Sequence, residues 1–570
     1  MTLSQPNPDC PPRPESCRAD RAAVAQLLRA FHHPDHEPLS QRAFARQQGV
    51  PRTTLQHWLQ RTQHPDADPD LATFCESPAG QHFLRRLVLA LHLVFHLDGT
   101  AGIRRLGRFL ELTGLDAFVA ASYGAQQALA VTLQESLVQY GLAERSRLAA
   151  TMPARTLSVC LDENFHQEQL CLVGIEPESG FVLLEEYHKR RDGETWTRAV
   201  QQAVHGLPVT VVQVTSDQAK GLIACAEEGL EAHHTPDLFH LQRALSQATA
   251  LPLERQRATA ATAQEQAATR VAATQQRQQD YQEGPRPPGR SPPFAADLRM
   301  ATAVLRQATT SLETCQQRQE QARQAIRGLA DSFHPFNTLT GQPRAEAVVE
   351  QELTSRVAAV EQIVASAALG ATSQAAVTRV QAWLVPLVVT VGWFWELVDL
   401  LLERLRLSAV QEQTVREQLL PGLYWQREAP RGRDPEQRRQ RRELSTRLLA
   451  AAWSSDSPLG SLSLADRDTL ERVCREAVGL FQRSSSCVEG RNGRLSLLHH
   501  GHGPLSAGRL QALTVVHNYL SRRADGTTAA ERFFRSKPCP VFEWLLERLP
   551  DLPRPAQRRK TVPEVAITAA

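Results

Sequence analysis

The sequence predicts a mostly helical protein that is built around one α/β core with a mixed sheet. Short apolar runs rich in β-branched residues, the pattern typical of buried strands, gather at 156–190 and 209–216. Apolar residues spaced three and four apart, the helical pattern, dominate 63–150 and 246–463. The 570 residues are too many for a single core, and we expect about three or four domains or large insertions.

The composition is that of a soluble globular protein, with 42% hydrophobic residues, 22% charged residues and a formal net charge of +3. The ten cysteines form no CxxC pair, which favours free thiols in a reducing cytoplasm. The stretch nearest to a membrane span, 384–402, contains a proline and two acidic residues and predicts a core helix. Residues 1–19 and 551–570 are expected to form a disordered leader and a disordered tail.

Residues 20–62 predict a helix-turn-helix DNA-binding domain. Ser40 is a plausible N-cap, Gly49 supplies the turn, and Pro51 lies where a second helix would begin. Polar side chains on the outer face of that second helix are expected to meet phosphates and base edges. These side chains belong to Arg52, Thr53, Thr54, Gln56 and His57. The alternative is an ordinary helical hairpin with a solvated face.

Residues 63–150 predict a helical domain. His92 and His96 lie four residues apart, which is a spacing that two metal ligands on a helix can have. No acidic motif accompanies them, so core histidines are the preferred interpretation.

Residues 151–245 predict the first part of the α/β core. The expected elements, in order, are strands at 156–165, 168–177 and 181–190, a helix at 192–206, a strand at 209–216 and a helix at 219–230. The first three strands are close enough in sequence to be joined as hairpins. Three antiparallel strands, a helix, a further strand and a helix are the opening of the RNase H-like fold.

Two aspartates follow apolar strand runs. Asp162 lies on the first strand and Asp217 directly after the fourth. A buried carboxylate is costly unless it has a partner or binds a cation, and two on neighbouring strands make a site for Mg²⁺. Glu163 should point to the opposite face of the sheet, so it is excluded. The alternative is that both aspartates cap the turns after their strands.

Residues 246–463 predict a helical insertion. A polar helix at 251–283, a Pro-rich tip at 284–293 and a second helix at 298–329 indicate an antiparallel arm. The basic run at 427–443 lacks apolar positions and is either a disordered linker or a phosphate-contacting patch.

Residues 464–550 predict the C-terminal helical part of the core. A long helix is expected at 464–496, with Glu489 near its end and the amide of Asn492 beside it. Glu489 is the third acidic candidate; Glu476 is the alternative, and Glu489 would then be a surface residue in a polar turn. The arginines expected to contact DNA here are Arg491 and Arg494.

These acidic motifs, in this order, resemble those of DDE-type bacterial transposases, which have an RNase H-like catalytic core. Asp237-Leu238-Phe239-His240 is similar to the C/D(2)H signature of the hAT, Mutator and P-element groups. In those groups a long helical insertion separates the second Asp from the catalytic Glu, as it would here. The stretch 517–534 also resembles the tail of bacterial transposases and integrase-like proteins. The resemblance covers roughly residues 155–245 and 480–550.

The resemblance implies that Asp162, Asp217 and Glu489 hold two Mg²⁺ (or Mn²⁺) ions. One metal would activate water or a 3′-hydroxyl, and the other would stabilise the leaving oxygen. His240, with Asp237, would position the scissile phosphate or a flanking strand.

The implied partner is double-stranded DNA, both the ends of a mobile element and its target. Assembly on that DNA as a homodimer or larger oligomer is expected, in the cytoplasm at the nucleoid and without a membrane. Two alternatives remain. One is a non-catalytic DNA-binding regulator with a degenerate core, and the other is a nuclease that does not join strands.

Overall fold

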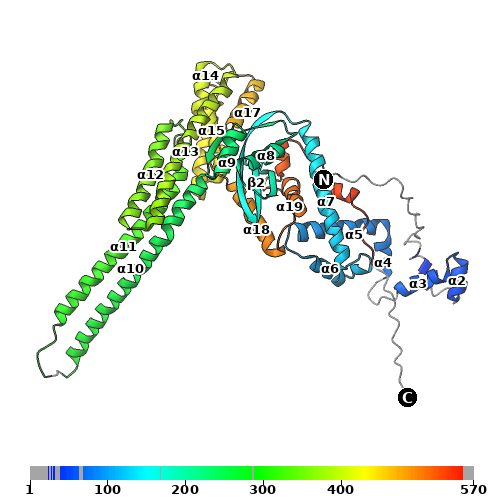
Figure 1. Ribbon diagram of the computed structural model, residues 1–570, viewed down its shortest axis with the longest axis horizontal. Coiled ribbons are helices and arrows are strands. Elements are labelled where there is room, and N and C mark those ends of the chain that lie inside the picture. The colour runs from blue at the N-terminus through cyan, green and yellow to red at the C-terminus, as the bar shows by residue number, and fades with distance from the viewer. Residues whose placement is uncertain are drawn as a thin grey trace. The chain divides into compact units, whose positions relative to one another are not determined.

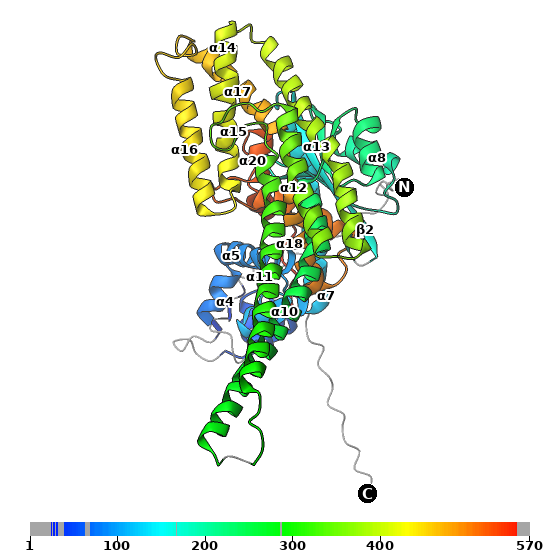
Figure 2. The same cartoon turned by 90° about the vertical axis from the view of Figure 1, so that its left-hand side faces the viewer.

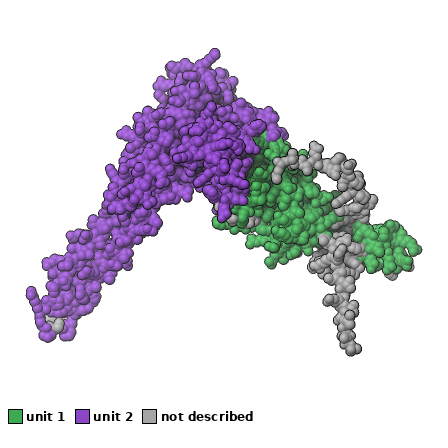
Figure 3. Space-filling view, viewed as in Figure 1, with its two compact units in different colours: residues 1–145, 497–520, 538–570 green, residues 146–496, 521–537 purple. Residues whose placement is uncertain are grey.

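The computed structural model divides the chain into two compact units, which Figure 3 colours separately. The residues it describes are 24, 27–28, 30–31, 39–62, 69–166, 168–285 and 288–555. Unit 1 comprises 1–145, 497–520 and 538–570, and unit 2 comprises 146–496 and 521–537. The expected leader at 1–19 and most of the expected tail lie outside the described residues. The segment 464–550, predicted as one part of the core, is shared between the units.

Unit 1 contains the two helices of the N-terminal prediction, α2 (Gln41–Gln47) and α3 (Arg52–Thr62). The Ser40 hydroxyl caps α2 by accepting a hydrogen bond from the Ala43 amide at 3.2 Å. Gly49 has a φ of +67° in the turn between the helices, a conformation that glycine adopts without strain. Phe44 and Leu55 are buried in the small core that the two helices share.

The remaining helices of unit 1 are α4 (Pro69–Glu76), α5 (Pro78–Leu91), α6 (Ile103–Leu112), most of α7 (Tyr123–Ala149), α19 (Ala507–Val515) and α21 (Val541–Arg548). His92 and His96 are buried in a π-helical segment, His92–Leu97. The ring of His92 is hydrogen-bonded to Gln126 at 2.7 Å, and that of His96 to the Ala101 carbonyl at 2.7 Å. They are core histidines, as expected.

Unit 2 contains one mixed sheet of five strands in the order β3-β2-β1-β4-β5. The strands are β1 (Arg155–His166), β2 (Gln169–Glu176), β3 (Phe181–His188), β4 (Val209–Ser216) and β5 (His233–Pro236). β1, β2 and β3 are antiparallel neighbours, whereas β4 runs parallel to β1 and β5 parallel to β4. The four predicted strands are present. The short β5 was not predicted.

The sheet register leaves β1 with a neighbour on one side only near Asp162. Pairing of β1 with β4 ends at Cys160, but pairing with β2 continues to His166. Asp162 therefore lies inside β1, not at its end as the sequence suggested, beside the point where β4 stops. Helix α8 (Gly193–Val204) packs on the sheet through the buried Trp196, and α9 (Lys220–Ala224) follows β4.

The insertion is helical, as predicted. Helices α10 (Leu238–Glu283) and α11 (Phe294–Ser332) pack along each other and form the long arm visible in Figures 1 and 2. The arm's base joins a large hydrophobic core. The other helices of unit 2 are α12 (Glu346–Ser366), α13 (Ala371–Glu403), α14 (Ala409–Thr414), α15 (Leu420–Glu428), α16 (Pro435–Ala452), α17 (Leu464–Leu480), the start of α18 (Ser486–His502) and α20 (Ala529–Phe534).

One described helix, α13, is long and apolar enough by length and composition to cross a membrane. Its Leu387, Val391 and Phe394 side chains are fully buried in the insertion core. This packing agrees with the predicted core helix.

The basic run at 427–443 is ordered and mostly helical. It covers the end of α15 and the start of α16, whose first turn is capped by Asp434 accepting a hydrogen bond from the Gln437 amide at 2.8 Å. The disordered-linker alternative is therefore wrong.

Candidate metal centre

Asp162 is a buried carboxylate on β1, with 7% of its surface exposed. One of its oxygens accepts a hydrogen bond from the Glu163 amide at 2.9 Å, and the other accepts one from the Asn492 side-chain amide at 3.3 Å. The strand thus fixes the aspartate from one side, and α18 reaches it from the other.

Asp237 begins α10 and orients His240. Its backbone N–H donates to the Ser216 carbonyl at 2.8 Å, which ties the start of α10 to the end of β4. One carboxylate oxygen caps the helix at the Phe239 amide, 2.8 Å away. The other accepts hydrogen bonds from His240 Nδ1, at 2.8 Å, and from the Ser485 hydroxyl. With its proton on Nδ1, His240 presents the lone pair of Nε2 to the centre.

Glu489 lies in the first turn of α18, not near the end of one long helix. The predicted helix at 464–496 is interrupted, because α17 ends at Leu480 and α18 begins at Ser486. The buried Gln213 side chain of β4 holds this break. Its amide donates to the Gln482 carbonyl at 3.1 Å, and its oxygen accepts from the Gln482 N–H at 3.1 Å. The interruption turns Glu489 towards the sheet.

A buried cluster of charges anchors the same break to the insertion. Glu428 is fully buried and pairs with Arg483 at 2.6 Å and with Arg431 at 2.7 Å. Burial opposes its ionisation, but Arg483, Arg431 and Arg427 together hold the pKa of Glu428 well below its usual range. Arg427 also donates to the Phe481 carbonyl at 3.0 Å. The insertion therefore fixes the segment that leads into Glu489.

Three side chains that can bind a metal converge between these elements. One ligand atom from each of Asp162, His240 and Glu489 lies within 4.8 Å of the others. Nε2 of His240 is 3.9 Å from a Glu489 oxygen, and Arg243 approaches the same carboxylate at 3.7 Å. The three residues come from β1, α10 and α18, so the tertiary fold alone brings them together.

The pKa values of Asp162 and His240 are both raised within the centre. Burial, opposed by His240 and by the hydrogen bond from Glu163, and reinforced by the negative charges of Glu489 and Asp217, raises the pKa of Asp162 to about 7. The hydrogen bond to Asp237 raises the pKa of His240, with further contributions from Asp162 and Asp217. A divalent cation would offset this accumulation of carboxylates.

Asp217 is next to the centre but outside the group of three. One of its oxygens accepts a hydrogen bond from the Ala219 amide at 3.0 Å, so it does cap the turn after β4. It also lines a pocket of about 440 Å³ together with His240, Arg243 and Trp383. The negative charge of Asp217 contributes to raising the pKa of both Asp162 and His240. The second carboxylate oxygen of Asp217 is a candidate metal ligand at the end of β4.

The donor set fits a divalent cation. Two carboxylates and one imidazole are typical ligands of Mn²⁺ or related ions, and Mg²⁺ accepts oxygen ligands best. The side-chain oxygen of Asn492 is buried and has no hydrogen-bond partner among the described residues. It is a candidate oxygen ligand near the same cluster, because the amide nitrogen of this side chain donates to Asp162 at 3.3 Å.

Other predicted site residues lie elsewhere. Arg491 was expected to contact DNA, but it is buried and donates two hydrogen bonds to the buried Glu185 of β3, at 2.7 and 2.8 Å. That prediction is wrong, because its guanidinium is fully engaged inside the fold. Arg494 is half-buried in α18. Glu476 does not take part in the centre. Its carboxylate accepts a hydrogen bond from the Thr156 hydroxyl at 3.0 Å, and Thr156 lies about 20 Å along β1 from Asp162.

In unit 1, α3 exposes most of the side chains that were expected to meet DNA. Arg52, Thr53 and Gln56 are exposed, and Thr54 is half-buried. The side chain of His57 lies outside the described residues.

Sequence reasoning noted the amide of Asn492 beside Glu489 but missed two supporting residues, Gln213 and Ser485. Gln213 offers a signal, since an amide in the middle of a continuously apolar strand must find buried partners. Ser485 lies in a polar stretch that gives no comparable signal.

Comparison with known proteins adds one family. Residues 415–561 match the model of a family of unknown function, DUF6399. The matched segment includes Glu489 and Asn492 but neither Asp162 nor Asp217. No curated protein and no solved structure matches the chain. Its function is therefore inferred from the geometry of the centre.

Proposed function

We propose that this chain is a DDE-type transposase, an enzyme that cleaves DNA and transfers strands at the ends of a mobile element with a divalent metal. The observation that carries the proposal is the convergence of Asp162, His240 and Glu489 within 4.8 Å from three separate elements. A histidine whose other ring nitrogen donates to a carboxylate is the arrangement in which metal-ligating histidines are usually oriented, and His240 has this arrangement through Asp237.

The fold supports the same class. The mixed sheet, with the strand order β3-β2-β1-β4-β5, three antiparallel strands and two parallel ones, supports the proposal of an RNase H-like core. The long insertion between His240 and Glu489 has the layout of the hAT and Mutator groups. The exposed polar face of α3 is suited to helix-turn-helix binding of double-stranded DNA, with the protein acting at the nucleoid in the cytoplasm.

The protein's residues have distinct roles in this proposal. Asp162, Glu489 and His240 would hold the metal, Asp217 would supply a carboxylate for a second ion, and Asp237 would keep Nε2 of His240 directed inward. Bound Mn²⁺ or Mg²⁺ would lower the pKa of the attacking hydroxyl and stabilise the leaving oxygen of the phosphodiester. Because one ligand is an imidazole, Mn²⁺ should bind more tightly than Mg²⁺.

Titration of Mn²⁺ into the full-length protein, followed by electron paramagnetic resonance, tests the centre directly. Asp162→Asn removes a charge from the ligand set and should lower Mn²⁺ affinity at least tenfold. Glu163→Gln is the matched control. It neutralises the neighbouring carboxylate, which pairs with Arg191 away from the centre, and should leave Mn²⁺ affinity unchanged.

A second experiment tests DNA cleavage and strand transfer. It measures nicking and joining of a labelled duplex that carries the DNA flanking the gene. Wild type should nick with Mn²⁺, whereas Asp162→Asn and Asp217→Asn should not, although both still bind the duplex. Nicking without joining would identify a nuclease. A wild-type protein that binds DNA but neither Mn²⁺ nor Mg²⁺ would overturn the enzyme proposal in favour of a regulator.

A further inference from the structure

Positive charge is concentrated in one short segment of the insertion. Residues 427–447 contain eight arginines and four acidic residues, a formal charge of +4, whereas the whole chain carries only +3. Such a local excess attracts polyanions even when the total charge is small.

Five of these arginines pair with a carboxylate, and among the described residues three do not: Arg438, Arg442 and Arg447, the last of which donates to the Leu339 carbonyl at 3.4 Å. Those with a carboxylate partner are Arg427, Arg431, Arg433, Arg439 and Arg441. Arg438 instead donates to the Gly432 carbonyl at 3.0 Å, and Arg442 donates to the Arg438 carbonyl at 3.2 Å. Among the residues that the structure describes, no carboxylate lies within ion-pair distance of either guanidinium. Like charges four residues apart on a helix destabilise it unless an anion lies between them.

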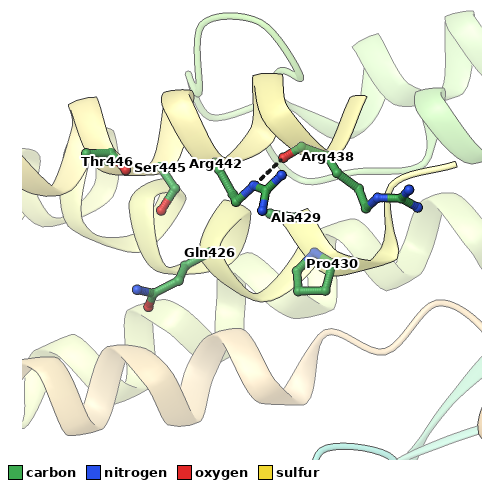
Figure 4. Close-up of a pocket in the computed structure, with 7 residues that line it drawn as sticks. All are labelled: Gln426, Ala429, Pro430, Arg438, Arg442, Ser445 and Thr446. Carbon is green, nitrogen blue, oxygen red and sulfur yellow. Dashed lines mark hydrogen bonds between the residues drawn. The ribbon is translucent and has the colours of Figure 1, made fainter. Parts of the chain in front are cut away.

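Two of these three arginines, Arg438 and Arg442, line the same pocket. It has a volume of about 600 Å³ and lies between α15 and α16. Figure 4 shows Arg438 and Arg442 extending from α16 over Ala429 and Pro430. The other lining side chains are polar and belong to Gln426, Ser445 and Thr446. Guanidinium groups with hydroxyl and amide neighbours are the usual donors to phosphate oxygens.

We infer that this pocket, the α15–α16 pocket, binds phosphate groups of the DNA backbone at a second contact surface separate from the metal centre. The choice of DNA as the source of the phosphates rests on the proposed function. The residues that line the pocket include no aromatic side chain on which a base could stack. The pocket would therefore bind the DNA backbone through charge, irrespective of the DNA sequence.

The test is the salt dependence of DNA binding by the full-length Arg438→Gln/Arg442→Gln protein, measured by fluorescence anisotropy. Affinity should fall equally for the flanking DNA of the gene and for unrelated duplex. The slope of log affinity against log salt should become shallower by about 2, because two phosphate contacts are lost. Arg439→Gln is the matched control, since Arg439 is on the same helix but already pairs with Glu436 at 2.8 Å. It should change the slope far less.

Further measurements separate the remaining outcomes. Mn²⁺ affinity should be the same in the double variant and wild type, since the pocket does not touch the metal centre. Loss of DNA binding with intact Mn²⁺ binding supports the inference, and it does so even if no cleavage is ever detected and the proposed enzyme fails. Equal slopes in the double variant and in Arg439→Gln would overturn it. Pyrophosphate that binds wild type but not the double variant, with DNA affinity unchanged, would also overturn it by assigning the pocket to a small phosphate ligand.

Discussion

The metal centre has two sides that are held in different ways. The sheet side, formed by β1, β4, β5 and the start of α10, is fixed by main-chain hydrogen bonds, such as the one from Asp237 to Ser216. The helix side, formed by residues 481–492, is fixed by side chains, chiefly Gln213, Arg427, Arg483 and the buried Glu428. Backbone pairing tolerates most substitutions, whereas side-chain anchoring fails with a single one. The helix side should therefore be the fragile half of the centre.

Glu428→Gln should have the largest effect. It leaves the guanidinium of Arg483 buried beside an uncharged group, and breaking a buried pair in this way costs about 3–5 kcal/mol. Urea unfolding should show the loss, and hydrogen exchange should increase in peptides that cover 478–490. Glu436→Gln is the control, because Glu436 is exposed and its pair with Arg439 at 2.8 Å is screened by solvent, so its loss should change stability little. If the two variants are equally stable, the helix side is not anchored by charge.

Asp237→Asn should have a smaller effect, confined to the sheet side. Asparagine still caps α10, so stability should change little. It no longer offers a charged acceptor to His240 Nδ1, and metal affinity should fall about 10–100-fold, as for other residues that orient a ligand. Isothermal titration with Mn²⁺ measures this loss. Asp192→Asn, which alters the N-cap of α8 instead, should bind Mn²⁺ as wild type does. A loss in both variants would indicate a general effect of weakened caps.

The response to pH should show the smallest difference between the two sides. Burial, with a contribution from the neighbouring His234, lowers the pKa of His233 in β5 to about 4. Its ring is hydrogen-bonded to Thr390 at 2.9 Å and stacks on Trp393. The unfolded chain takes up a proton near pH 6.5 and the folded chain does not, so this stability is present above pH 6.5 and is lost as the pH falls towards 4.

At pH 5 the loss attributable to His233 should be about 1–2 kcal/mol. Unfolding free energies of wild type and His233→Gln, measured from pH 7 to pH 5, should therefore converge. Glutamine can keep the hydrogen bond to Thr390 but does not titrate. Parallel pH profiles for the two proteins would show that His233 contributes nothing. On the helix side, burial and the neighbouring Arg483 likewise lower the pKa of His334, so the effect of His233 is isolated by its own variant.

The sequence predicted the sheet side better than the helix side, for a physical reason. Apolar runs located four strands, and the resemblance of Asp237-Leu238-Phe239-His240 to the C/D(2)H signature pointed to the oriented histidine. β5 was missed because His233–Pro236 is too short and too polar to form an apolar run. The break before α18 was missed because it depends on partners far away in sequence, Gln213 and Glu428. Arg491 was assigned to DNA because nothing nearby in sequence reveals its buried partner, Glu185.

The insertion also determines when during synthesis the centre can form. His240 leaves the ribosome well before Glu489, and at about 5–20 residues per second the intervening chain takes roughly 12–50 s to make. During that time the nascent protein already carries Asp162, Asp217 and His240, but it lacks the third ligand and the segment that orients it. An incomplete chain therefore cannot assemble the ligand set. The three candidate ligands can come together only after the helical insertion has been translated and packed.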